Sequence, residues 1–140
     1  MYNYRFTERG GSPDKVAHII FAVSLTWLLG YRTTADLITA ALFAPVPDLD
    51  LFFEHRKLLH NIFFVIGFPL FLFLFAPQIP FPADLIALSS HVALDMLSFS
   101  GVAIFYPLSN RRFGLKLISS GYPTLAVVLL IVIMIFLLYT

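Results

Sequence analysis

Cysteine is absent from this chain of 140 residues, and charged side chains are scarce. Without Cys there can be no disulfide and no metal site built on thiolates, so a metal would have to be held by His, Asp or Glu. Asp, Glu, Lys and Arg make up 12% of the residues, whereas soluble domains carry roughly 25%. The nine basic residues do not form the concentrated positive surface of a nucleic-acid-binding protein, so we expect no nucleic-acid partner.

Hydrophobic residues make up 59% of the chain. A domain of this size leaves a large share of its surface exposed, so it cannot hide that much apolar surface from water. A lipid bilayer is therefore the expected surroundings and partner. The chain has no internal repeat and no low-complexity linker. We expect one membrane-embedded helical domain over residues 1–140, with a polar cytoplasmic segment at 1–14 and a site-bearing loop at 46–61.

Runs without Asp, Glu, Lys or Arg predict the membrane segments. At about 1.5 Å per residue, roughly 20 apolar residues cross a hydrocarbon layer about 30 Å thick. The expected fold class is therefore all-α, a polytopic membrane helix bundle with about four to five transmembrane helices. The expected segments are Val16–Tyr31, Leu37–Val46, Leu58–Ala83, Leu85–Asn110 and Leu117–Thr140, of which the fourth is interrupted by Asp95. The second is short and could be a partial crossing. The first could be a signal peptide, but no small-x-small cleavage site follows it.

Capping and helix-breaking residues separate these segments. Gly30 is expected to close the first helix, Thr33 or Thr34 to cap the second, and Pro45 with Pro47 to stop it. The remaining boundaries are expected at Ser12-Pro13, at Pro77, Pro80 and Pro82, at Gly101 and Pro107, and at Gly121-Tyr122-Pro123.

Lys and Arg divide unequally between the two faces of a five-crossing bundle. Only Arg32 falls on one face. The other face carries Arg5, Arg9, Lys15, Arg56, Lys57, Arg111, Arg112 and Lys116. Because basic residues mark the cytoplasmic side, we expect a multi-pass protein of the cell (inner) membrane with a cytoplasmic N-terminus and an external C-terminus.

All four histidines fall on or near that same face, together with three acids. The seven candidate metal ligands are His18, Asp48, Asp50, His55, His60, His91 and Asp95. A carboxylate inside an apolar helix costs several kcal/mol unless it is paired, so Asp95 marks a functional site. His91 precedes it by one helical turn and shares its face. A simple hydrogen bond between the two would also explain their spacing.

Imidazole and carboxylate are ligands that suit zinc and similar divalent ions. Two ions about 3.5–4 Å apart can clamp the attacking and leaving oxygens of a phosphoester, so Asp48, Asp50 and Asp95 are candidate catalytic residues. We expect one or two ions, zinc first and manganese second. Four bases could attract an anionic substrate, although their role as topology determinants is the simpler interpretation. They are Arg56, Lys57, Arg111 and Arg112.

Five separated pieces of the sequence, from His18 to the stretch Gly101–Pro107, match a known pattern in order. The others are Pro47-Asp48-Leu49-Asp50, the segment from His55 to His60, and His91-Val92-Ala93-Leu94-Asp95. Together they resemble the membrane-bound metal-dependent hydrolases of the YdjM/YbcI type. The pattern is also similar to that of zinc-dependent phospholipases C and single-strand zinc nucleases.

That resemblance implies a multi-pass hydrolase in which Asp48 or Asp50, His55 or His60, and His91 bind one ion. By the same resemblance Asp95 would bridge and His18 would serve another ion. The sequence departs from the pattern at Asn61, where Ser is common, and at Ser98, where Thr is common.

The expected function is a membrane-bound metal-dependent hydrolase, acting on phosphoesters and in particular on lipid head groups at the cytoplasmic face. Two alternatives stay open at this point. A transporter could use the His/Asp set to bind a passing cation, although its ligands should then continue through the membrane. A non-catalytic membrane scaffold could hold the metal for structural reasons.

Overall fold

The computed structural model describes residues 15–52, 57–98, 100–117 and 122–139. These residues form five α-helices and one 3-10 helix and contain no β-strand, apart from an isolated bridge between Val102 and Phe113. The expected all-α class is therefore confirmed for this part of the chain. The helices are α1 Lys15–Leu28, α2 Thr34–Phe43, η1 Val46–Phe52, α3 Ile62–Phe75, α4 Phe81–Leu97 and α5 Tyr122–Tyr139.

Apart from α2, the helices are shorter than the apolar runs that predicted them. The third run is divided by a proline-containing turn, so that Ile62–Phe75 forms α3 and its last three residues begin α4. Helix α4 ends at Leu97 rather than near Gly101 or Pro107. Residues 100–117 form an irregular connection instead. Among the described residues, no helix is both long and apolar enough to cross a membrane, which differs from the four to five transmembrane helices expected.

Several expected helix boundaries are confirmed. The Thr33 hydroxyl accepts a hydrogen bond from the Asp36 N–H, and the Asp36 carboxylate accepts one from the Thr33 N–H, which completes a capping box. Gly30 follows α1 with a positive φ of 95°, a conformation that suits the end of a helix. Helix α2 stops at Phe43, before Pro45. The boundary expected at Ser12-Pro13 lies outside the described residues.

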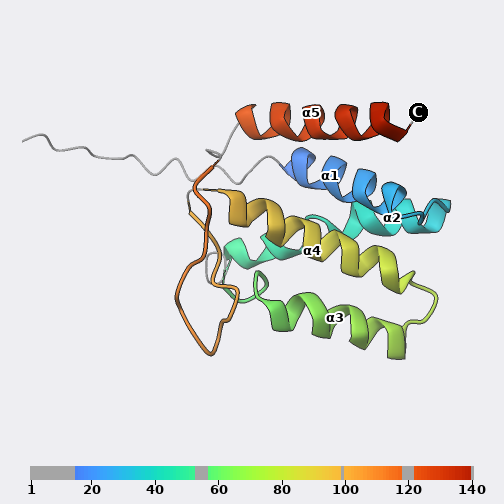
Figure 1. Ribbon diagram of the computed structural model, residues 1–140. Coiled ribbons are helices and arrows are strands. Elements are labelled where there is room, and N and C mark those ends of the chain that lie inside the picture. The colour runs from blue at the N-terminus through green and yellow to red at the C-terminus, as the bar shows by residue number, and fades with distance from the viewer. Residues whose placement is uncertain (1–14, 53–56, 99, 118–121, 140) are drawn as a thin grey trace, which may run out of the picture.

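Helix α4 lies at the centre of the bundle, with α3 on one side and α1 and α2 on the other (Figure 1). Small side chains let the helices approach closely: Ala22 of α1, Ala40 of α2 and Ala87 of α4 are fully buried in one cluster. Helix α5 packs on α1, and buried Val128 contacts Ala17 and Leu94.

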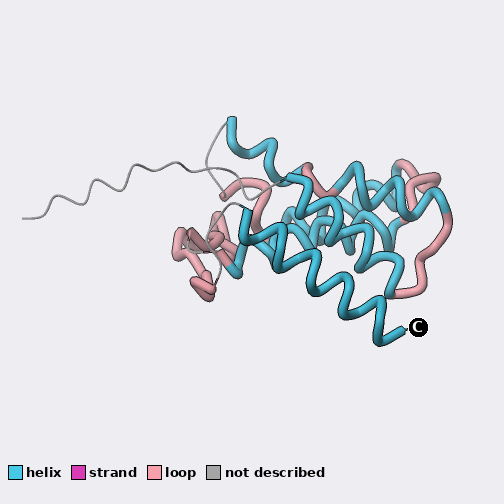
Figure 2. Tube along the Cα trace, turned by 90° about the horizontal axis from the view of Figure 1, so that it is seen from above, coloured by secondary structure: helices cyan, strands magenta, loops and turns pink. Residues whose placement is uncertain are grey.

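The helices alternate in direction, which brings many of their connections to one end of the bundle. Figure 1 shows α1 and α5 beginning, and α4 ending, at this end, with η1 beside them. Figure 2 shows the tip of α5 at the opposite end, away from the irregular connection of residues 100–117. We call the first of these the site end, because the predicted ligands meet there.

Candidate metal centre

Five of the predicted ligands meet inside the site end. His18 comes from α1, Asp48 from η1, His60 from the turn before α3, and His91 and Asp95 from successive turns of α4. All are buried, with Asp48 the most exposed at 5%. The spacing of four residues places His91 and Asp95 on one face of α4, and the packing of α1 against α4 brings His18 to the same face.

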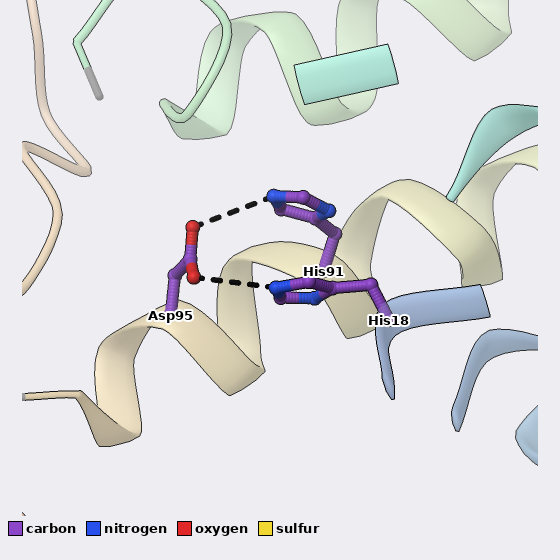
Figure 3. A group of neighbouring side chains, drawn as sticks. All are labelled: His18, His91 and Asp95. Carbon is purple, nitrogen blue, oxygen red and sulfur yellow. Dashed lines mark ion pairs between the residues drawn. The ribbon is translucent and has the colours of Figure 1, made fainter. Parts of the chain in front are cut away.

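Asp95 lies between the histidines. Its Oδ1 lies 3.5 Å from His18 Nε2, and its Oδ2 lies 3.0 Å from His60 Nε2 and 3.4 Å from His91 Nε2. Figure 3 shows the His18 and His91 rings stacked, each with a nitrogen facing one Asp95 oxygen. The ring centroids are 3.9 Å apart. The two oxygens of one carboxylate therefore face two different groups of histidine nitrogens.

The outer nitrogen of His91 is held by the backbone. His91 Nδ1 lies 2.6 Å from the Ala44 carbonyl oxygen, which follows α2. A carbonyl oxygen only accepts hydrogen bonds, so Nδ1 carries the hydrogen, and in a neutral ring Nε2 is left with a lone pair. That lone pair faces Asp48 Oδ1 at 3.5 Å as well as Asp95.

His60 is held in the same way by an acid. Its Nδ1 lies 3.4 Å from Asp50 Oδ2. The same oxygen accepts hydrogen bonds from the backbone N–H groups of Lys57 and Leu59, at 2.9 and 3.0 Å. In the tautomer that donates from Nδ1 to Asp50, Nε2 is again the lone-pair nitrogen, whereas a hydrogen on Nε2 would be donated to Asp95 Oδ2, 3.0 Å away.

The two lone-pair nitrogens face each other. His60 Nε2 and His91 Nε2 are 3.2 Å apart, with Asp95 Oδ2 beside both. If both rings carry their hydrogen on Nδ1, three buried atoms that only accept point into the same small space, and burying such groups without a positive partner is costly. A cation placed among them would satisfy all three.

The arrangement offers two overlapping sets of ligands. One set is His18, His91 and Asp95, and the other is Asp48, His60 and His91; the ligand atoms in each set lie within 4.8 Å of one another. Nitrogen and oxygen donors of this kind fit a zinc-like divalent ion. The buried atoms Asp48 Oδ2 and His18 Nδ1 have no hydrogen-bond partner. Each ligand set therefore contains a residue with an atom that no hydrogen bond occupies.

Asp48 lies outside the long helices, on η1. Burial raises the pKa of its carboxyl group, but a hydrogen bond from a protonated His91 ring and the positive charge of His91 and His18 outweigh burial in the metal-free protein, so the pKa lies below its ordinary value. Asp48 is therefore disposed to be a carboxylate, the form that binds metal ions.

The other predicted residues stand apart from this group. Asp50 faces the far side of the His60 ring, and His55 and Arg56 lie outside the described residues. Arg111 and Arg112 are exposed on the connection of residues 100–117, and Lys57 contributes its backbone to the turn before α3.

Two features of the site were not predicted. One is the Ala44 carbonyl, for which the sequence carries no signal because any residue supplies a carbonyl. The other is the capping role of Asn61, whose side chain accepts from the Phe64 N–H at 2.9 Å and donates to the Lys57 and Leu58 carbonyls. An Asn before an apolar run is a recognisable capping signal.

Comparisons with known proteins identify the family of the chain. The model of a family described as YdjM inner membrane protein matches residues 14–140. Two proteins of Methanothermobacter thermautotrophicus, "Uncharacterized protein ORF4'" and "Uncharacterized protein ORF4", are 40% and 38% identical over 60 residues, or 43% of this chain. The matched segment spans about a quarter of the length of these relatives (25%). No solved structure matches significantly. Because the family model covers nearly the whole chain, the protein belongs to the YdjM inner membrane protein family.

Proposed function

We propose that this protein is a metal-dependent hydrolase of phosphoesters whose metal centre is the His/Asp group at the site end. The observation that carries the proposal is the pair of facing lone-pair nitrogens, His60 Nε2 and His91 Nε2, 3.2 Å apart beside Asp95. With the hydrogens on Nδ1, where Asp50 and the Ala44 carbonyl accept them, the two nitrogens repel unless a positive ion lies between them. Zinc is the first expectation and manganese the second, with one or two ions per chain.

The roles of the residues follow from where they face. His18, Asp48, His60 and His91 would be ligands, and Asp95 would bridge the two ligand sets because each of its oxygens faces a different set. Asp50 and the Ala44 carbonyl would fix the tautomer and the orientation of His60 and His91. When bound, a divalent ion polarises a phosphoryl oxygen and lowers the pKa of water. The protein's own part is to supply the ligands in a buried, fixed geometry.

We propose further that the bundle lies in the inner membrane with the site end toward the cytoplasm, so that lipid head groups are the nearest phosphoesters. Membership in an inner membrane protein family supports this. Large apolar side chains are exposed along α3 and α5, including Phe71, Phe75, Leu137 and Leu138, and such surfaces mark contact with a membrane or a partner.

The described basic residues support this orientation. Lys15, Lys57, Arg111, Arg112 and Lys116 belong to segments at the site end, and Arg32 lies in the α1–α2 turn at the other end. Single cysteines in a chain that has none would test it. Asn110→Cys should react with an impermeant reagent from the cytoplasmic side only, and Gln78→Cys, in the α3–α4 turn, from the outer side only. Reaction of both from one side would contradict the orientation.

Metal analysis of the full chain purified in detergent tests the hydrolase proposal. Wild-type protein supplied with zinc or manganese should retain about one or two ions and hydrolyse a chromogenic phosphoester in a chelator-sensitive way. His91→Ala should lower both, whereas Ser90→Ala, at a buried neighbour that donates to the Ala87 carbonyl, should lower neither. Metal-free wild-type protein would mean that a proton, not a metal ion, joins the histidines, and the proposal would fail.

A further inference from the structure

Residues 100–117, which we call the α4–α5 connection, fold back on themselves. Val102 and Phe113 exchange two backbone hydrogen bonds, each 2.9 Å long. The N–H groups of Leu115 and Leu117 donate to the Met96 and Leu97 carbonyls at the end of α4, at 2.7 and 3.0 Å. The segment is thus tied to the bundle at its base, while its tip projects from the site end (Figure 1).

The inner side of this connection is packed. Val102 and Ala103 are fully buried, and the Ile62 N–H donates to the Ile104 carbonyl at 2.9 Å, close to His60. Gly101 and Gly114 pass so closely that a Cβ on Gly114 would lie 2.8 Å from Gly101 Cα. These contacts fix which side of the segment faces outward.

The outer side combines apolar and cationic side chains. Phe105, Leu108, Leu115 and Leu117 are 45%, 79%, 63% and 69% exposed. Arg111, Arg112 and Lys116 are exposed among them. The chain contains no Asp or Glu after Asp95.

We propose that the α4–α5 connection is an interfacial anchor that binds anionic phospholipids of the bilayer. Its leucines and Phe105 would enter the acyl boundary, and Arg111, Arg112 and Lys116 would contact the negatively charged head groups. Interleaved apolar and basic side chains are the pattern that binds anionic membrane surfaces. A nucleic-acid surface is a poorer match, because its affinity for proteins comes mainly from phosphates, to which exposed leucines would not contribute.

This proposal assigns Arg111 and Arg112 to the membrane rather than to the substrate of the metal centre. It does not depend on a metal ion. A binding measurement made without added metal therefore tests it separately from the proposed hydrolase function.

The experiment places a polarity-sensitive fluorophore on Asn110→Cys, at the exposed tip beside Arg111. The labelled full chain is reconstituted in vesicles of phosphatidylcholine alone, or of phosphatidylcholine with increasing phosphatidylglycerol. A label on Gln78→Cys, exposed in the α3–α4 turn within a stretch of sequence that has no Lys or Arg, is the matched control. We expect the label at position 110 to shift to the blue as phosphatidylglycerol increases, and the label at position 78 not to respond.

Replacing Arg111, Arg112 and Lys116 by Gln should weaken the response to phosphatidylglycerol by about fivefold per charge removed. Replacing Phe105 and Leu108 by Ser should reduce the blue shift even in anionic vesicles, because the apolar insertion is lost. A response at position 110 that is the same in neutral and anionic vesicles, or that survives neutralisation of the three bases, would overturn the proposal. So would an equal response at position 78.

Discussion

His60 Nδ1 lies 3.4 Å from Asp50 Oδ2, an oxygen that also accepts the backbone N–H groups of Lys57 and Leu59. One buried acid therefore closes the turn before α3 and turns the His60 ring so that Nε2 faces Asp95. Sequence reasoning left open whether Asp48 or Asp50 is the ligand. The geometry supports Asp48 as the ligand and Asp50 as the positioning residue.

Asp50→Ala should weaken metal binding by about 10–100-fold, the usual cost of losing a partner that orients a ligand. Asp50→Asn keeps an acceptor oxygen for the turn and should restore part of the affinity. Competition with a coloured chelator would measure both dissociation constants. Affinity unchanged in Asp50→Ala would show that His60 needs no such support.

Asp95→Asn should lose an ion and nearly all hydrolytic activity, because the amide removes the negative charge that would bridge two cations. Asp84→Asn is the matched control, since Asp84 is an equally buried acid on the same helix but belongs to neither ligand set. Metal content and hydrolysis should be unchanged in that variant. Equal behaviour of the two variants would leave Asp95 as a structural acid.

Asn61→Ala should lower the free energy of unfolding by about 1 kcal/mol, because the side chain caps α3. Asn61→Ser should recover most of that loss, since a Ser hydroxyl can also accept from the Phe64 N–H. Thermal unfolding in detergent would compare the two. Equal stability of the Ala and Ser variants would argue against the cap.

Gly114→Ala should destabilise the α4–α5 connection by about 1–3 kcal/mol, because the new methyl group would meet backbone atoms of Gly101 and Ser98 at 2.8 and 3.0 Å. Gly67→Ala meets nothing within 4 Å on α3 and should instead stabilise by about 0.5–1 kcal/mol. Thermal unfolding of both variants in detergent provides the measurement. Unchanged stability in Gly114→Ala would mean that the backbone segments around Gly101 and Gly114 are not held so closely.

Local signals in the sequence predicted the helix types and several of their ends. Thr33, Gly30 and Pro45 act on neighbouring backbone, so their effects are visible in a short stretch of sequence. The end of α4 was placed too late, because the apolar stretch after Leu97 reads like more helix, while the chain there folds back and bonds to Met96 and Leu97. Hydrogen bonds between backbone groups far apart in the chain produce no periodic pattern in the sequence.

The candidate site was predicted in part for a similar reason. The spacing of four residues between His91 and Asp95 predicted that they share one face of a helix. The basic residues predicted which segments lie at the same end of the bundle. The choice between Asp48 and Asp50 depends on which way each side chain turns within η1, and the hydrogen bond from His91 to the Ala44 carbonyl depends on tertiary packing. Neither is encoded in a local motif.

The central claim is that His60 and His91 bind the same ion or two adjacent ions through Nε2. X-ray absorption at the zinc edge, on the zinc-loaded full chain in detergent, tests it most directly. The account predicts a shell of only N and O ligands at about 2.0–2.2 Å with clear imidazole scattering, weakened in His60→Ala and in His91→Ala. A spectrum of hydrated zinc without imidazole scattering, or one that neither variant changes, would contradict it.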